Sequence, residues 1–169
     1  MCNCESTATG CQLVYRQERA GELAVEAKDG VEFRLLATWA DLFACLPAVR
    51  RRLGTVGLLK AAAKIATPSR LLYVVRVRGD IVNWGWISIS FCRHYPVGKK
   101  DVVIGPVRTA EEFRGRGLAT WGLKQAINAM VRRGHRVFFI DTSDGNGAMR
   151  KAIARCGFGE PVSSYPRSG

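Results

Sequence analysis

The residues best suited to chemistry are two arginines that alternate with two glycines, Arg114-Gly115-Arg116-Gly117, followed by Leu118-Ala119-Thr120. Glycines at alternate positions let the backbone turn tightly and approach a ligand closely. Apolar residues then recur at helical spacing as far as Arg133, so the segment opens a helix whose free N–H groups and dipole attract anions. Together with the two arginines, this pattern indicates a site for a pyrophosphate.

Two other kinds of phosphate-binding loop do not fit this segment. A P-loop ends in Gly-Lys followed by Ser or Thr, whereas Leu118-Ala119-Thr120 stands here. A dinucleotide-binding fingerprint needs a third glycine, and the chain has Thr120 at that position. The alternative interpretation is a solvated glycine turn with surface arginines.

Turn residues and apolar periodicity predict the elements of the first half of the chain. Asp29-Gly30 predicts a tight hairpin between two short strands, and Thr38 is a candidate cap for a helix. The expected elements are strands over residues 12–17, 23–27 and 31–36, and helices from residue 39 and over residues 55–66.

The second half predicts an α/β arrangement around the glycine segment. Pro106 interrupts an expected strand over residues 101–108, and because proline cannot donate to a ladder it marks a bulge or a break. From this strand onward, strand and helix alternate, which predicts a parallel pair of neighbouring strands. The other expected elements are strands over residues 71–77, 81–89 and 136–141, helices over residues 117–133 and 146–156, and a final strand up to residue 166.

Two segments carry a resemblance to a known family. Arg114-Gly115-Arg116-Gly117-Leu118-Ala119 resembles the acetyl-CoA signature of the GNAT superfamily of N-acetyltransferases. Asn146, followed eleven and twelve positions later by Gly157-Phe158, resembles the family's second segment, and the resemblance covers residues 71–158 well. It implies an α/β (α+β) fold: a GNAT-like mixed, mostly antiparallel central sheet with a splayed parallel strand pair, flanked by helices.

The resemblance also implies how acetyl-CoA is held. Pantetheine would enter the gap between the two parallel strands, where the backbone of Val107 and Thr109 would bond its amides. The Val107 N–H would also polarise the thioester carbonyl, and Asn146 would touch the pantetheine arm. The implied cofactor-binding residues are Val107, Thr109, Arg114, Gly115, Arg116, Gly117, Leu118, Ala119, Thr120 and Asn146.

One position departs from the family pattern. Many members carry a tyrosine seven residues after the asparagine, as general acid for the leaving thiolate, whereas this chain has Ile153. Cys156 and Tyr165 lie downstream and are candidates for the missing donor, and water is the alternative. Asp141, at the carboxyl end of a strand, is a candidate base. The candidate catalytic residues are therefore Val107, Asp141, Cys156 and Tyr165.

Other residues near the expected site have more than one interpretation. Trp84 and Trp86 share one face of a strand, and packing on the sheet is favoured over a wall of the acceptor pocket. Glu111 and Glu112 are better explained as caps of the turn before the arginines than as a base. The remaining polar groups there are His94, Tyr95, Asp101 and Asp144.

Length and composition suit one domain. We expect a flexible tail over residues 1–11 and a single acyltransferase domain over residues 12–169. The chain has no apolar run long enough for a membrane helix and no signal-like start, so we expect a cytoplasmic protein without membrane insertion. Cys2, Cys4 and Cys11 lie close together, but no nearby fourth ligand completes a zinc set, and we expect no metal.

The formal net charge of +12 predicts a polyanionic partner. Aromatic residues are not interleaved with the arginines, so nucleic acid is not favoured. The basic loop over residues 93–100 favours an anionic small-molecule acceptor, such as a nucleotide-linked amino sugar, although acetyl-CoA is itself anionic. The strand with the two tryptophans and the terminal strand each offer a route to a homodimer.

Together with these observations, the resemblance implies an N-acetyltransferase that moves the acetyl group of acetyl-CoA to a primary amine by direct attack in a ternary complex. A first alternative is a domain that holds acyl-CoA without turnover, because Ile153 supplies no acid. A second alternative is a basic nucleic-acid-binding protein.

Overall fold

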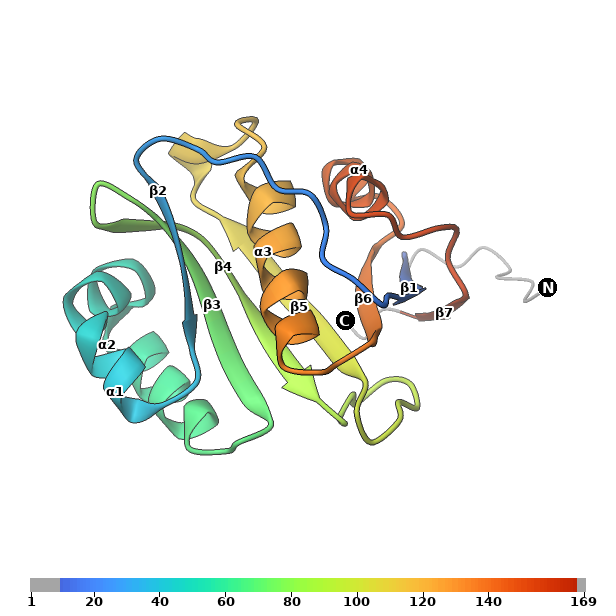
Figure 1. The fold of residues 1–169 in the computed structure, drawn as a ribbon, viewed down its shortest axis with the longest axis horizontal. Coiled ribbons are helices and arrows are strands. Elements are labelled where there is room, and N and C mark those ends of the chain that lie inside the picture. Colours follow the sequence, from blue (N-terminus) through green and yellow to red (C-terminus); the bar gives the residue numbers. More distant parts are fainter. Residues whose placement is uncertain (1–9, 167–169) are drawn as a thin grey trace.

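The computed structural model describes residues 10–166, which form a twisted sheet flanked by helices (Figure 1). Within this range the sheet has seven strands in the order β2-β3-β4-β5-β6-β1-β7. The strands are β1 (Cys11–Glu18), β2 (Val31–Leu36), β3 (Arg70–Val77), β4 (Asp80–Ile89), β5 (Val102–Thr109), β6 (Val137–Ser143) and β7 (Ser163–Pro166). The helices are α1 (Trp39–Ala44), α2 (Leu46–Ile65), α3 (Leu118–Arg132) and α4 (Gly147–Arg155), with a short 3₁₀ helix η1 (Glu111–Phe113) before α3.

Alternation along the strands divides the core into two sides. In β3, Leu71 and Tyr73 belong to the cluster that includes α3 and α4, whereas Leu72 and Val74 belong to the cluster that includes α1 and α2. Neighbouring residues of a strand point to opposite faces of a sheet. Helices α3 and α4 therefore cover one face, which we call the α3 face, and α1 and α2 cover the other, the α2 face.

Strands β5 and β6 form the parallel pair, and they separate after a short ladder. The ladder has three register pairs and ends at Ile104 and Ile140, while the other strand pairs are antiparallel. Gly105-Pro106 follows in β5, where the ladder with β4 also changes register. A proline without an N–H accounts for this loss of regular pairing. The predicted mixed sheet with a splayed parallel pair is thus confirmed.

The predicted strand over residues 23–27 is wrong, and so is the hairpin at Asp29-Gly30 that depended on it. Strand β2 pairs with β3, and residues 19–30 instead form an extended strap that runs across α3 (Figure 1). The Asn128 side chain of α3 accepts a hydrogen bond from the Leu23 N–H (2.7 Å) and donates one to the Leu23 carbonyl (2.8 Å). The strap has the extended backbone that its sequence favours, but its partners are side chains of a helix.

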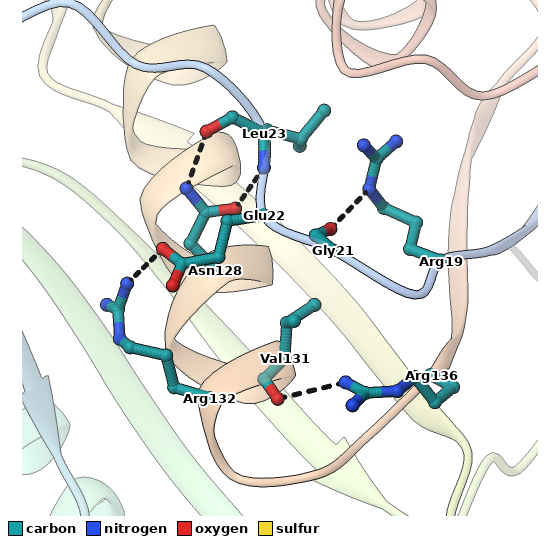
Figure 2. A network of polar contacts seen from close by, with 8 residues as sticks. All are labelled: Arg19, Gly21, Glu22, Leu23, Asn128, Val131, Arg132 and Arg136. Carbon is teal, nitrogen blue, oxygen red and sulfur yellow. Dashed lines mark hydrogen bonds and ion pairs between the residues drawn. The ribbon is translucent and has the colours of Figure 1, made fainter.

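More side chains of α3 hold the strap. Figure 2 shows the Asn128 contact together with the ion pair of Arg132 and Glu22. Outside the strap, Arg136 donates to the Val131 carbonyl (3.1 Å) and so ties the C-terminal end of α3 to the segment before β6. Two further bonds run from Trp121 Nε1 to the Glu26 carbonyl (2.9 Å) and from Lys124 Nζ to the Ala24 carbonyl (3.2 Å). The strap therefore fixes the helix whose first turn follows the glycine segment.

The first helices and strand match the sequence in most respects. Thr38 caps α1, with Asp41 completing a capping box. Gly54, with φ 70°, breaks α2, so the helix predicted from residue 55 corresponds to its second half. Strand β1 begins at Cys11, which the sequence had assigned to the tail, and the rest of that predicted tail lies almost entirely outside the described residues.

The strand order bears on the two predicted routes to a homodimer. Strand β4, with both tryptophans, lies between β3 and β5, so the prediction that it pairs with a second copy is wrong. Strand β7 lies at an edge of the described sheet, and a dimer through it stays a prediction. Among residues 10–166, none of the helices combines the length and the apolar character needed to cross a membrane.

Candidate functional site

A groove of about 950 Å³ lies beside the end of β5, at the N-terminal end of α3 and along α4. Its lining also includes residues of α2 and β4. Nine of the predicted cofactor-binding residues line it: Val107, Thr109, Arg114, Gly115, Gly117, Leu118, Ala119, Thr120 and Asn146. The two sequence motifs, which are far apart in the chain, therefore meet at one surface feature.

The two glycines of the signature have the backbone that the sequence predicts. Gly115 and Gly117 have φ of 76° and 71°, in the left-handed region that side chains disfavour. A Cβ built on either glycine meets nothing within 4 Å, so the space above them is open. Gly117 is the N-cap of α3 and has no side chain to cap the first turn. The first-turn N–H groups are thus suited to an anion in the groove.

Two asparagines fix the backbone that lines the groove. Asn83, fully buried in β4, donates to the Arg108 carbonyl (2.9 Å) and to Thr109 Oγ1 (2.9 Å), beyond the break in β5. Asn146 accepts from the Met149 N–H (3.1 Å) and so caps α4. Sequence reasoning found Asn146 but missed Asn83, for which the available signal was an amide inside an apolar strand.

Basic side chains surround the groove. Arg52 of α2 forms an ion pair with Glu112 (2.9 Å), and Arg114 forms one with Glu111 (3.5 Å). The two glutamates therefore pair with arginines, and their capping of the turn stays a prediction. Sequence reasoning missed four further basic residues that line the groove, Arg52, Arg108, Lys151 and Arg155. The available signal was the spacing of Lys151 and Arg155, which lie four positions apart on α4 and so share a face of that helix.

Three side chains singled out in the sequence differ in how they relate to the groove. Arg116 does not line the groove, and its guanidinium lies over the Phe113 ring at 5.0 Å from the centroid. Trp84 lines the groove and also packs against the cluster that includes α1 and α2; its contact with an acceptor stays a prediction. Trp86 instead carries the Lys64 ammonium over its ring at 4.5 Å, which matches packing against α2.

On the α2 face, Asp141 lies within a group of aromatic residues. It is the first residue of β6 after the last ladder pair with β5, and the Tyr95 hydroxyl donates to its carboxylate at 3.2 Å. Tyr165 of β7 also bonds this carboxylate, and the His94 ring stacks on Tyr165 with centroids 4.9 Å apart. We call these four residues the Asp141 cluster. Neither Asp141 nor its three partners line the groove.

Burial alters the acid–base properties of this cluster. It raises the pKa of Asp141 above the ordinary value, while the hydrogen bonds from Tyr95 and Tyr165 and the charge of His94 lower it by less. Burial, followed by the charge of Asp141, raises the pKa of Tyr165 to about 12. The cluster therefore pairs a carboxylate of increased basicity with phenols that stay protonated, a combination common at functional sites.

Two other residues singled out in the sequence lie in the core. Cys156 is fully buried, and its Sγ donates to the Thr120 carbonyl at 3.7 Å. Burial raises the pKa of its thiol to about 12, which disfavours a thiolate. Ile153 is also fully buried. Among residues 10–166 no cluster of potential metal ligands occurs, and Cys2 and Cys4 lie outside that range.

The four sequence candidates for catalysis thus lie in three places. Val107 lines the groove, where the cofactor was expected. Asp141 and Tyr165 lie together in the Asp141 cluster on the α2 face. Cys156 lies in the core between α3 and α4, in neither of these places.

Known proteins resemble this chain in family and in fold. A family model described as the acetyltransferase (GNAT) family matches residues 37–158, whereas no curated protein matches the chain. A solved aminoglycoside N-acetyltransferase in complex with CoA is 16% identical with a TM-score of 0.64, over 86% of this chain and 99% of that one. A tandem GNAT protein from the clavulanic acid biosynthesis pathway is 16% identical with a TM-score of 0.65, over 95% of this chain and 53% of that one. A GNAT-family acetyltransferase from Colwellia psychrerythraea is 18% identical with a TM-score of 0.61, over 96% of this chain and 58% of that one.

At these identities, the solved structures have the same fold as this chain, and they carry no conclusion about its acceptor. The family model carries the assignment, because its match covers most of the chain and includes the groove, both sequence motifs and the splayed strands. The chain belongs to the acetyltransferase (GNAT) family.

Proposed function

We propose that the protein transfers the acetyl group of acetyl-CoA to a primary amine by direct attack in a ternary complex. One observation carries the proposal. The β5–β6 ladder ends at Ile104 and Ile140, and the groove beside this end is lined by the first turn of α3 and by Asn146. A pyrophosphate at the helix N-terminus and an extended arm between the splayed strands suit this shape and charge.

Each side of the sheet has a separate task in this proposal. First-turn amides of α3 hold the pyrophosphate, and the backbone of Val107 and Thr109 binds the arm. The Val107 N–H stabilises negative charge on the carbonyl oxygen. On the α2 face, Asp141 accepts the proton that the amine loses. The amine nitrogen forms a bond to the acetyl carbon, the carbon–sulfur bond breaks with its electron pair on sulfur, and CoA leaves as the thiol after protonation.

The proposed acceptor carries a negative group near its amine. Arg108 lies opposite Trp84 in the β4–β5 ladder, and cross-strand partners share a face of the sheet. Trp84 packs against the cluster that includes α1 and α2, so Arg108 lies on the α2 face. Arg52 of α2 lines the same groove. Two arginines on the side of Asp141 favour a phosphorylated amine, such as a nucleotide-linked amino sugar, over a polycation.

A panel of amines tests the proposal through release of the CoA thiol from acetyl-CoA. Turnover with at least one amine is expected, with phosphorylated amines used better than neutral amines and polyamines. Equal use of all three classes would contradict the anionic acceptor and leave acetyl transfer standing. A thermal melt tests the cofactor separately: acetyl-CoA at 100 times its Kd should raise Tm by about 5–10 °C.

A second function is favoured by one residue. Ile153 occupies the position of the family's tyrosine acid, which supports a domain that binds acetyl-CoA without turnover. This alternative predicts the same rise in Tm and no thiol release with any amine. The melt and the release assay together therefore separate the two functions.

A further inference from the structure

Helix α4 presents two basic side chains to the groove. Lys151 and Arg155 both line it, and both are exposed. They lie four positions apart, which puts them on one face of the helix, about 6 Å apart along its axis. Helix α4 itself contains no aspartate or glutamate. Among residues 10–166, no carboxylate forms an ion pair with either side chain.

This basic pair differs from two arginines elsewhere in the groove lining. Arg52 and Arg114 each have a glutamate as partner, whereas Lys151 and Arg155 have none among the described residues. Like charges four positions apart repel each other and destabilise a helix. The helix dipole favours Arg155, which lies in the last turn, but not Lys151 in the middle of the helix. A bound anion would stabilise both side chains.

A contact with α3 fixes where the basic pair lies. Cys156, directly after Arg155, donates from Sγ to the Thr120 carbonyl at 3.7 Å. Thr120 belongs to the first turn of α3 and lines the groove. Ala152, directly after Lys151, also lines the groove and belongs to the core cluster that α3 shares. The basic pair therefore lies beside the first turn of α3, where the proposed function puts the pyrophosphate.

The chemistry of acetyl-CoA supplies a suitable anion next to that pyrophosphate. Its ribose carries a phosphomonoester at the 3′ position, a few bonds from the pyrophosphate. A phosphomonoester has a second pKa of about 6, so it carries nearly two negative charges at neutral pH and offers three acceptor oxygens. Helix α4 packs on the α3 face, whereas the negative group of the acceptor is proposed on the α2 face. The donor therefore suits the basic pair better than the acceptor does.

We propose that Lys151 and Arg155 form a subsite for a phosphomonoester, the ribose 3′-phosphate of acetyl-CoA. The subsite rests on the proposed function. The ammonium and the guanidinium donate charge-assisted hydrogen bonds to the phosphate oxygens. No covalent bond changes at this subsite. Its role is to select acetyl-CoA over acyl donors that have the same arm and lack this phosphate.

Calorimetric titration with acetyl-CoA and with acetyl-3′-dephospho-CoA tests the subsite. We expect the wild type to bind acetyl-CoA about tenfold more tightly, the effect of two exposed ion pairs. The double variant Lys151→Gln/Arg155→Gln should bind the two donors with equal affinity. The control Arg133→Gln/Arg150→Gln removes the same charge from residues that do not line the groove, and it should keep the tenfold preference. Both variants should bind the dephosphorylated donor equally well.

The other outcomes would overturn the subsite. Equal affinity of the wild type for both donors would do so directly. An equal loss of affinity for both donors in Lys151→Gln/Arg155→Gln, relative to the control, would assign the pair to the pyrophosphate. A raised KM for a phosphorylated amine with an unchanged donor preference would assign it to the acceptor.

A stability measurement separates this role from a structural one. Both side chains are exposed, so the free energy of unfolding of Lys151→Gln/Arg155→Gln should equal that of the control. Lower stability with an intact donor preference would show that the pair serves the helix alone. Failure of the wild type to bind either donor would instead refute the proposed function.

Discussion

The groove and the Asp141 cluster on the α2 face are built in different ways. The groove depends on the backbone: two left-handed glycines, the first turn of α3 and the end of β5. The Asp141 cluster depends on side chains that three separate segments bring together. A backbone site suits a donor common to a whole family, whereas a side-chain site can change with each acceptor. Substitutions should therefore act differently on the two sides.

The largest effect is expected at Asp141. Asp141→Asn removes the proposed base and keeps the shape, so kcat should fall about 10²–10⁴-fold while acetyl-CoA affinity stays unchanged. In the wild type, kcat/KM should rise with pH through the raised pKa of Asp141, and this acidic limb should disappear in the variant. A pH–rate profile of both proteins is the measurement, and an unaltered profile would remove Asp141 from the mechanism.

Stability should show the opposite pH dependence at two neighbouring carboxylates. Burial raises the pKa of Asp141 on folding, so its contribution is present below the unfolded value and is lost as pH rises through the folded one. Hydrogen bonds from the Cys11 and Gly145 N–H groups lower the pKa of Asp144, so its contribution is lost as pH falls. At neutral pH, Asp141→Asn should raise Tm and Asp144→Asn should lower it. Equal shifts in thermal melts would contradict this assignment.

The next largest effect is expected at Gly117. Gly117→Leu places a side chain over the first turn of α3 and strains a backbone with φ 71°, so acetyl-CoA should bind about 30- to 100-fold more weakly. Gly134→Leu is the matched control, because Gly134 has φ 89° just beyond the other end of the same helix. Both variants should lose similar stability, and calorimetric titration should show weaker binding in the first alone. Equal affinities of the two variants for acetyl-CoA would contradict the view that the groove depends on the backbone of the first turn of α3.

A smaller effect is expected from charge on the α2 face. Arg108→Glu should lower kcat/KM for a phosphorylated amine about tenfold, because an ion pair with the acceptor becomes a repulsion. Arg51→Glu is the control, since Arg51 pairs with Asp80 and does not line the groove. Steady-state kinetics with phosphorylated and neutral amines is the measurement. A loss of the same size with both classes of amine would argue against an anionic acceptor.

The smallest effect on function is expected from the strap. Asn128→Ala leaves the N–H and carbonyl of Leu23 unpaired, which should cost about 1–3 kcal/mol of unfolding free energy. Acetyl-CoA affinity should change little, because Asn128 lies on α3 away from the groove lining. Denaturant unfolding and a binding titration measure the two quantities. A large loss of affinity would show that the strap supports the donor side directly.

Most of the fold followed from local sequence rules. The glycine segment, the apolar face of α3 and the strand interrupted at Pro106 all act within a few residues, so periodicity and turn chemistry revealed them. The prediction of a strand in the strap failed because residues 23–27 favour an extended backbone whatever their partner. Only the tertiary contacts with Asn128 and Trp121 decide that this partner is a helix.

The candidate site divides in the same manner. The groove residues were predictable because they form two continuous motifs, and Asp141 was predictable from its place at the end of a strand. The partnership of Asp141 with Tyr95 and Tyr165 joins residues far apart in the chain, and no spacing rule encodes it.

The central claim is that donor and acceptor meet where β5 and β6 separate. A crystal structure of the complex with acetyl-CoA tests this claim most directly. It should show the pyrophosphate at the first turn of α3, and the acetyl group between Val107 and Asp141, just beyond the pair Ile104 and Ile140. Acetyl-CoA bound elsewhere, or with its acetyl group directed away from the α2 face, would contradict the account.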